Sequence, residues 1–490
     1  MVHVSAPYKK TEKTRDSTGF FFVLMALLLS FQIFRRRIID TFPISILRFI
    51  SSLEPPELDS GMGILWFITS LVLPPMFVVQ PLHRLQSVYE WRSLDFNFPS
   101  RSFEESVINS GRYIPGNSVP LDVDSADDGR VWITIPRLLR GVPATLATLN
   151  GHPGDASPVL EPYPSWGWHH EGDCNGMTSV FRVQVDRCGR LWVPDTGKVD
   201  VLGKRTQICP PTLLIFDTVL DQLSVRYTIP PSQRSSNTLI VNIAVDITAT
   251  CHDAVAYMAD VTGFRLIAYS LRDHTSWRIE SNYFYPYPRW GYFRIAGSEF
   301  DLMDGVIGLA LSPTYHDGDK ILYFHSLASD SESWVRASVL RDNSNFFNGT
   351  NRRPRSFRLF PGTRQGQVAA QAMDDEGILF FSLLSTNSLV CWNSRLPYSQ
   401  SRFVELERDN EALQFASGVK IVHRNGYQEL WVLTSRLQKV ITGTLNRADI
   451  NFRILRAPVS FLVQGTPCDV QFDDDDESLL DSQSFVDWDA

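Results

Sequence analysis

The most regular feature of the sequence is a short strand pattern that recurs six times. Each copy starts with a polar or glycine turn, and aromatic and aliphatic residues then alternate along it. The copies span residues 128–134, 188–195, 252–260, 318–325, 376–382 and 426–434. Alternation with a period of two, bounded by turn residues, is typical of β-strands. Each copy therefore predicts one strand.

One aromatic residue marks the same place in every copy. These anchors, 51 to 66 residues apart, are Trp132, Trp192, Tyr257, Tyr323, Phe380 and Trp431. Between anchors there is room for about three more strands, as in residues 213–217, 263–270 and 389–393. Four short strands repeated six times are typical of a β-propeller, although repetition alone also fits several packed all-β domains. We therefore predict an all-β fold, a six-bladed β-propeller with four short strands per blade, over residues 81–470, with a helix near 102–110.

The N-terminal part has a different character. Residues 19–34 and 62–79 are two apolar stretches, and the first is flanked by basic residues on both sides. Sixteen apolar residues are few for a membrane-spanning helix but enough for the hydrophobic region of a signal peptide. We expect residues 1–80 to be an N-terminal extension with signal or anchor segments, or a wrongly assigned start over 1–61. On either interpretation the protein is secreted and extracellular, and membrane attachment would come only from an uncleaved N-terminal segment.

Composition and charge narrow the class of protein. The chain of 490 residues is 43% hydrophobic and 20% charged, which is typical of a globular protein and excludes a mainly disordered chain. Its net charge of −8 argues against nucleic acid as a partner, because phosphate binding needs a concentrated basic surface. Residues 471–490 hold eight acidic and no basic side chains, so we expect an acidic, disordered tail there.

Six cysteines support export. Cys174, Cys188, Cys209, Cys251, Cys391 and Cys468 all follow residue 80. An even number in an exported chain suggests disulfides, and free buried thiols are the alternative. Cys188 and Cys209 each begin a predicted strand, so antiparallel pairing would put them at opposite ends, and the connectivity stays open. Asn348 begins the sequence Asn-Gly-Thr, an acceptor motif for N-glycosylation.

Common catalytic motifs are absent from the sequence. The chain contains no Gly-x-Ser-x-Gly, His-Glu-x-x-His or Walker A motif, so the sequence identifies no catalytic residue, metal site or cofactor. Asp195 and Asp260 end two of the repeated strands just before turns, where they either line a central channel or cap the turns. The adjacent His169 and His170 are expected in a polar loop.

Two loops are rich in aromatic residues. Residues 163–168 include Trp166, and residues 283–290 include Trp290. Exposed rings of this kind can hold a cation or a flat aromatic ligand, whereas packing between blades is the alternative role. Both tryptophans are therefore candidate ligand-binding residues.

The sequence contains a series of distinctive ordered runs between Tyr89 and Asp469. They lie at residues 89–91, 95–96, 113–115, 136–137, 141–146, 162–166, 172–174, 179–183, 190–193, 195–197, 209–211, 309–313, 322–325, 327–329, 391–394 and 451–455. In these runs the chain resembles the insect yellow / major royal jelly protein family. The resemblance implies a six-bladed propeller, secretion and a role in cuticle pigmentation and melanin biology. Some members of the family are associated with dopachrome conversion, and others bind biogenic amines.

The chain departs from the family pattern near the expected ligand end of the channel. Where relatives have Pro-Asn-Asp, this sequence has Ala416, Ser417 and Gly418. Loss of an amide and a carboxylate removes hydrogen bonds and charge that would hold an amine. Ser417 is the remaining polar candidate. The expected function is binding of a small aromatic ligand or an extracellular matrix component, and a dopachrome-converting isomerase is the alternative.

Overall fold

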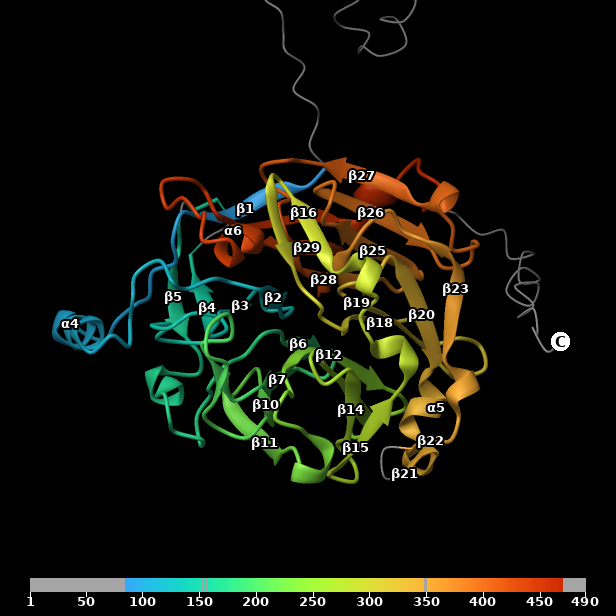
Figure 1. The fold of residues 1–490 in the computed structure, drawn as a ribbon, viewed down its shortest axis with the longest axis horizontal. Helices are drawn as coiled ribbons and strands as arrows, with labels where there is room; N and C mark the ends of the chain where they lie inside the picture. Colours follow the sequence, from blue (N-terminus) through green and yellow to red (C-terminus); the bar gives the residue numbers. More distant parts are fainter. Residues whose placement is uncertain (1–83, 152–153, 156, 348–349, 470–490) are drawn as a thin grey trace, which may run out of the picture. The chain divides into compact units, whose positions relative to one another are not determined.

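The computed structural model describes residues 84–151, 154–155, 157–347 and 350–469. Their strands form six four-stranded antiparallel sheets arranged around a common axis (Figure 1). This arrangement confirms the predicted six-bladed β-propeller. The extension over 1–80, the tail over 471–490 and Asn348 lie outside the described residues.

The first three blades follow one another along the chain, each from its innermost to its outermost strand. Blade 1 contains β2 (Asp122–Ser125), β3 (Val131–Thr134), β4 (Leu146–Asn150) and β5 (Val159–Pro162). Blade 2 contains β6 (Gln184–Asp186), β7 (Arg190–Asp195), β10 (Thr212–Asp217) and β11 (Gln222–Thr228). Blade 3 contains β12 (Ile240–Ile247), β13 (Ala254–Asp260), β14 (Arg265–Ser270) and β15 (Thr275–Glu280).

Blades 4 and 5 follow the same order, whereas blade 6 takes its outermost strand from the N-terminal side of the described chain. Blade 4 contains β18 (Val306–Leu311), β19 (Ile321–Ser326), β20 (Ser331–Arg336) and β23 (Arg358–Thr363). Blade 5 contains β24 (Val368–Met373), β25 (Ile378–Leu383), β26 (Ser388–Asn393) and β27 (Val404–Arg408). Blade 6 contains β28 (Ala416–Arg424), β29 (Tyr427–Thr434), β30 (Phe452–Pro458) and, outermost, β1 (Gln86–Trp91). The antiparallel pairing of β1 with β30 closes the ring.

The six aromatic anchors occupy the second strand of their blades. Each is at most 3% exposed, from Trp132, Trp192, Tyr257 and Phe380 at 0% to Tyr323 at 3%. The repeated pattern therefore marks the core of every blade, because a large ring on the second strand fills the space against the neighbouring sheet.

Short hairpins and helices decorate the blades. The hairpins are β8 (Lys198–Val199) with β9 (Thr206–Gln207), β16 (Tyr292–Ile295) with β17 (Ser298–Asp301), and β21 (Phe346–Phe347) with β22 (Thr350–Asn351). The α-helices are α4 (Arg101–Asn109), α5 (Ala337–Arg341), α6 (Leu437–Ile441) and α7 (Val459–Val463). The 3₁₀ helices are η1 (Trp166–His169), η2 (Pro231–Gln233), η3 (Asn282–Phe284), η4 (Pro288–Trp290), η5 (Asn343–Asn345), η6 (Pro354–Ser356) and η7 (Gln400–Arg402).

The predicted helix forms as α4, which projects from the side of the propeller (Figure 1). It begins after Ser100, whose Oγ accepts a hydrogen bond from the backbone N–H of Phe103 at 3.1 Å. In the described part of the chain, no helix has the length and apolar character needed to cross a membrane.

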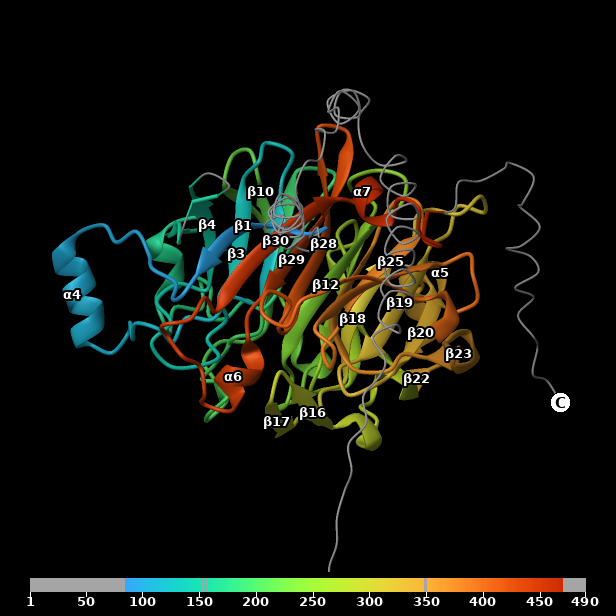
Figure 2. The same ribbon diagram turned by 90° about the horizontal axis from the view of Figure 1, so that it is seen from above.

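One face of the propeller carries the β16–β17 hairpin and α6, and α7 lies on the other side (Figure 2). We call the first the hairpin face. Phe293 and Ile295 of β16 are buried and belong to the same hydrophobic cluster as Leu239 and Phe415. Leu239 directly precedes the innermost strand β12, and Phe415 directly precedes the innermost strand β28. The hairpin thus covers the end of the channel where the innermost strands begin.

All six cysteines form disulfides, as their even number predicted. The pairs are Cys174–Cys209, Cys188–Cys251 and Cys391–Cys468, with Cα–Cα distances of 5.4, 6.0 and 6.5 Å. Strands β7 and β10 are antiparallel neighbours, so the cysteines that precede them do lie toward opposite ends of that pair. The bond between Cys188 and Cys251 joins blade 2 to the β12–β13 turn of blade 3.

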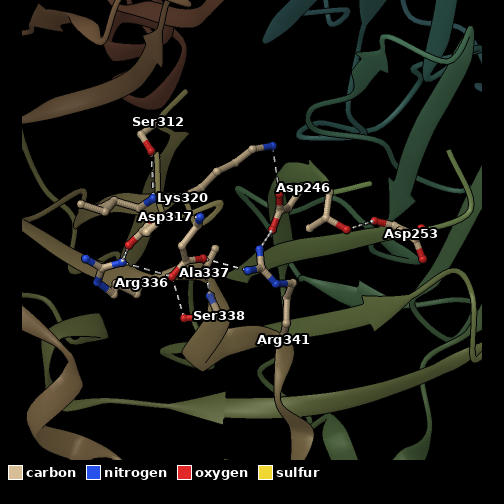
Figure 3. Close-up of polar contacts among 12 residues, drawn as sticks. Asp246, Asp253, Ser312, Asp317, Lys320, Arg336, Ala337, Ser338 and Arg341 are labelled. Atoms are coloured by element: carbon tan, nitrogen blue, oxygen red, sulfur yellow. Dashed lines mark hydrogen bonds and ion pairs between the residues drawn. The ribbon is translucent and has the colours of Figure 1, made fainter. Parts of the chain in front are cut away.

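Charged side chains link blades 3 and 4 as well (Figure 3). Asp246 of β12 lies 3.0 Å from Lys320 Nζ and 2.6 Å from Arg341 Nη1. Arg341, at the end of α5, also contacts Asp319 at 2.8 Å. Because the Asp246 side chain is fully buried, these two cations supply the charge balance that its burial requires.

Candidate functional site

A cavity of about 150 Å³ lies in the central channel and is bordered by residues of all six innermost strands or the segments leading into them. Its polar lining residues are Asp122, Asp124, Arg182, Gln184, Asn242, Gln371 and Lys420. Its apolar lining residues are Val185, Ile243, Ala244, Val245, Leu309, Ala310, Leu311, Ala370, Ala372, Met373, Val419 and Ile421. None of the described residues that border this cavity is aromatic, so the apolar contacts they offer a ligand come from aliphatic side chains and Met373.

The pairing of strands explains how this lining arises. In each blade the residue of the innermost strand that pairs with the aromatic anchor borders the cavity. These six residues are Asp124, Gln184, Ala244, Ala310, Ala372 and Lys420. The sixfold repeat thus builds a ring of six side-chain positions, three polar and three alanine.

Two carboxylates on β2 hold blade 1 against blade 2. Asp122 Oδ2 accepts a hydrogen bond of 3.1 Å from the backbone N–H of Val183, and Asp124 Oδ2 accepts one of 2.8 Å from Val185. Burial raises the pKa of both carboxyl groups, and that of Asp124 rises to about 7. Asp124 is therefore poised to exchange a proton near neutral pH.

Arg182 crosses the channel next to this pair. Its guanidinium group donates hydrogen bonds to the carbonyl oxygens of Ser417 at 2.8 Å and Ala369 at 2.9 Å. The side chain is buried, and its charge and that of Asp122 favour each other's ionised form. Arg182 therefore ties blade 2 to blades 5 and 6 across the axis.

Lys420 completes the charge balance of the cavity. Its Nζ lies 3.1 Å from Asp122 Oδ2 and donates a hydrogen bond of 2.6 Å to the carbonyl oxygen of Val183. With two carboxylates facing one lysine and one arginine, the fully ionised lining has no net charge. A strongly charged ligand would gain little from this site over a neutral one.

Two buried oxygen atoms of the lining residues have no hydrogen-bond partner within the described chain. They are Asp122 Oδ1 and Gln371 Oε1. Gln371 is held by its amide nitrogen, which donates to Glu332 Oε1 at 2.9 Å. Both unpartnered atoms are acceptors, so they suit a ligand that carries O–H or N–H donors.

Asp195 and Asp260 occupy equivalent places in blades 2 and 3, on the hairpin face and apart from the cavity lining. Asp195 accepts hydrogen bonds from the backbone N–H groups of Thr178 and Ser179 at 2.6 and 2.8 Å. Asp260 accepts one from Leu239 at 2.8 Å. Each carboxylate thereby holds the segment that leads into the innermost strand of its own blade, and burial raises the pKa of Asp195.

The three other candidates are spread over separate regions. Ser417 lies in β28, buried, and its Oγ has no hydrogen-bond partner within the described residues. Trp166 stacks on Phe98 with ring centroids 5.0 Å apart, beside α4. Trp290 is half-buried in η4, and its carbonyl oxygen accepts a hydrogen bond from Gln367 Nε2 at 3.0 Å. The structure does not bring these residues and the two aspartates into one site, and their role in binding stays a prediction.

His169 is buried rather than part of a polar loop, whereas His170 is exposed. The ring of His169 lies between the backbone N–H of Thr145 and the carbonyl oxygen of Tyr163. Burial and the neighbouring Arg137 lower the pKa of His169 to about 3, so it is neutral. Among the described residues, no group of three His, Cys, Asp or Glu side chains is placed to hold a metal ion.

Comparisons with known proteins place the chain in a family. The model of the major royal jelly protein family matches residues 178–468. The chain is 38% identical over 413 residues to protein yellow of Drosophila subobscura, covering 82% of this chain and 71% of that protein. It is also 38% identical over 421 residues to protein yellow of Drosophila yakuba, covering 84% and 75%.

Among solved structures, virginiamycin B lyase from Staphylococcus aureus matches with a TM-score of 0.36 and 12% identity, covering 70% of this chain and 95% of the lyase. The family model and the yellow proteins agree with each other over most of the propeller, and the three disulfides are consistent with the extracellular location of such proteins. The chain therefore belongs to the yellow / major royal jelly protein family.

Proposed function

We propose that this protein is a secreted yellow-type propeller that acts in insect cuticle pigmentation by binding a small aromatic ligand in its central cavity. The observation that carries the proposal is the pair of unpartnered acceptors, Asp122 Oδ1 and Gln371 Oε1, on residues lining a cavity of about 150 Å³. A volume of this size accommodates one benzene-sized ring. Hydroxyl or amine groups on that ring would supply the missing donors.

Calorimetric titration of the secreted protein tests this proposal. Dopamine, serotonin and a tyrosine-derived dihydroxyindole are the probes. Dopamine, whose single ring matches the cavity volume, should release or absorb heat at a stoichiometry of one, and the two probes with larger fused rings should bind more weakly. Ala244→Phe fills the cavity from the middle of β12 and should abolish the signal. Gln371→Met removes one unpartnered acceptor at similar size and should weaken binding about tenfold.

Ala448→Phe is the matched control, because Ala448 is exposed in a loop between α6 and β30. It should bind like the wild type. Thermal unfolding of each variant shows whether it is folded. The proposal fails if no probe binds to the wild type, or if Ala244→Phe folds and still binds.

A second function, dopachrome conversion by an isomerase mechanism, is favoured by one feature of the same cavity. A general acid or base works best when its pKa lies near the working pH, and the pKa of Asp124 is about 7. In this mechanism Asp124 would take a proton from carbon and return one to oxygen.

Loss of dopachrome colour faster than its spontaneous decay would indicate this enzyme. Asp124→Asn should then abolish the acceleration while the binding heat with the stable probes remains. If the protein did not change the rate of dopachrome decay but the stable probes still gave a binding heat, the protein would be a ligand carrier and not this enzyme.

A further inference from the structure

A groove separate from the channel lies between the outer edges of blades 3 and 4. Its volume is about 630 Å³, and its walls are the end of β15 with η3 on one side and the segment from β22 to β23 on the other. Asn351 Nδ2 donates a hydrogen bond of 3.0 Å to the carbonyl oxygen of Glu280. The buried rings of Phe284 and Phe357 meet edge to face with centroids 5.8 Å apart. These contacts fix the two walls against each other.

One wall of this groove is rich in arginine. Arg355 and Arg358 line it, and the exposed Arg352 and Arg353 precede them in the chain. Glu280, the one carboxylate among the described lining residues, is paired with a cation from its own strand, at 3.0 Å from Arg278. The groove therefore presents positive charge on a chain whose net charge is −8.

The opposite wall offers aromatic and amide groups. The Tyr283 ring borders the groove, and Tyr285 is 53% exposed beside it. Asn282 is exposed between them. An exposed aromatic face provides a flat apolar surface, and amide groups both donate and accept hydrogen bonds. This combination suits sugar rings, which have an apolar face and a rim of hydroxyl groups.

The backbone next to the groove is poorly suited to receive a peptide strand. Strand β23 is the outermost strand of blade 4, but Pro361 within it lacks an N–H donor. At Gly362 the backbone packs so closely on blade 5 that a Cβ atom would lie 1.8 Å from the carbonyl oxygen of Tyr398. Recognition in the groove must therefore come from side chains, which favours a polysaccharide over an acidic peptide.

We propose that this groove binds an anionic polysaccharide of the extracellular matrix. The arginine side chains bind its sulfate or carboxylate groups, since the guanidinium fork matches such oxyanions with paired hydrogen bonds. Tyr285 packs against a sugar ring. The site is independent of the central cavity, so the protein could hold its aromatic ligand while attached to the matrix.

Heparin is the probe for this site, and its binding to the secreted full-length protein is measured by surface plasmon resonance at several salt concentrations. The double variant Arg353→Glu/Arg358→Glu should bind at least about tenfold more weakly, with a shallower dependence on salt, because fewer counterions are released. Tyr285→Ala should weaken binding several-fold, and this loss should persist at high salt.

The variant Arg101→Glu/Arg447→Glu is the matched control, because it makes the same change in net charge at two exposed arginines. Arg101 lies in α4, on the opposite side of the propeller from β22 (Figure 1). This control should bind heparin like the wild type, and all variants should unfold at the same temperature. The proposal is overturned if the wild type does not bind heparin at low salt, if the control loses as much affinity as the groove variant, or if polyglutamate competes as well as heparin.

Discussion

Asp124 makes the stability of this protein depend on pH in a direction opposite to that of most carboxylates. Its side chain is buried, and its pKa rises to about 7 in the folded protein from the usual value of 3.8. Between about pH 4 and 7 the folded state therefore holds a proton that the unfolded chain has released. Stability must fall as pH rises through this window, because the folded state binds more protons than the unfolded state.

Asp124→Asn should remove this contribution. We expect the free energy of unfolding of the wild type to decrease between pH 4.5 and 7.5 more steeply than that of the variant, as measured by urea denaturation. The exposed Asp301→Asn is the control and should keep the wild-type slope. If the free energy of unfolding fell equally steeply with pH in Asp124→Asn and in the wild type, the raised pKa of Asp124 would be contradicted.

At the scale of single residues, the aromatic anchors could be predicted and the cavity could not. Alternation and turns locate Trp132 and its five equivalents from the sequence alone. The residue that faces each anchor depends on the length of the turn between the first two strands. The separation between the two residues is eight in blades 1, 2 and 5, eleven in blade 6 and thirteen in blades 3 and 4. Asp124, Gln184 and Ala372 share the separation of eight residues, so this spacing was a signal in three of the six blades.

At the scale of elements, α5 is held to blade 3 by charge. Arg341 ends α5, and its guanidinium group contacts Asp246 (Figure 3). The same group also contacts Asp319 at 2.8 Å. The Asp246 side chain is fully buried, whereas that of Arg341 is 23% exposed. Removal of this cation leaves Lys320 as the one described cation that pairs with the buried carboxylate, and an under-compensated buried charge is costly.

Arg341→Ala should therefore lower the free energy of unfolding by about 2 to 3 kcal/mol, measured by urea denaturation. Arg336→Ala is the control from the same cluster. Its side chain is 43% exposed and pairs with the exposed Asp317, so its loss should change stability by less than about 1 kcal/mol. If both variants lost the same free energy of unfolding, the burial of Asp246 would not determine how much stability the loss of its partner removes.

Prediction at the element scale succeeded where the signal was local. The second strand of each blade follows from alternation and turn residues, the room for three more strands follows from the spacing of the anchors, and the helix α4 was expected near 102–110. The disulfide partners did not, because Cys188 and Cys251 are 63 residues apart and meet only when two blades pack together. The β16–β17 hairpin over the channel was missed for the same reason, since its buried rings pack against residues from several blades.

At the scale of the whole molecule, the ring is closed by segments from both ends of the described chain. Strand β1 forms the outer edge of blade 6, and it also contacts blade 1, since the indole N–H of Trp91 donates a hydrogen bond of 2.8 Å to the carbonyl oxygen of Pro158. The backbone N–H groups of Gly154 and Ser157 donate to carbonyl oxygens of β1 as well. The first and last blades therefore depend on the same strand.

Trp91→Ala should consequently destabilise the entire propeller. Trp91 is 1% exposed, so its truncation leaves a large cavity at the closure and should cost about 3 to 5 kcal/mol. Urea denaturation followed by far-UV circular dichroism and by tryptophan fluorescence should shift to lower midpoints by the same amount, because all blades lose their support together. Tyr427→Ala is the control, as Tyr427 is 73% exposed, and its midpoint should not move. If the midpoint measured by fluorescence shifted while the midpoint measured by circular dichroism did not, β1 would contribute to local stability only, and the other blades would stay folded without its support.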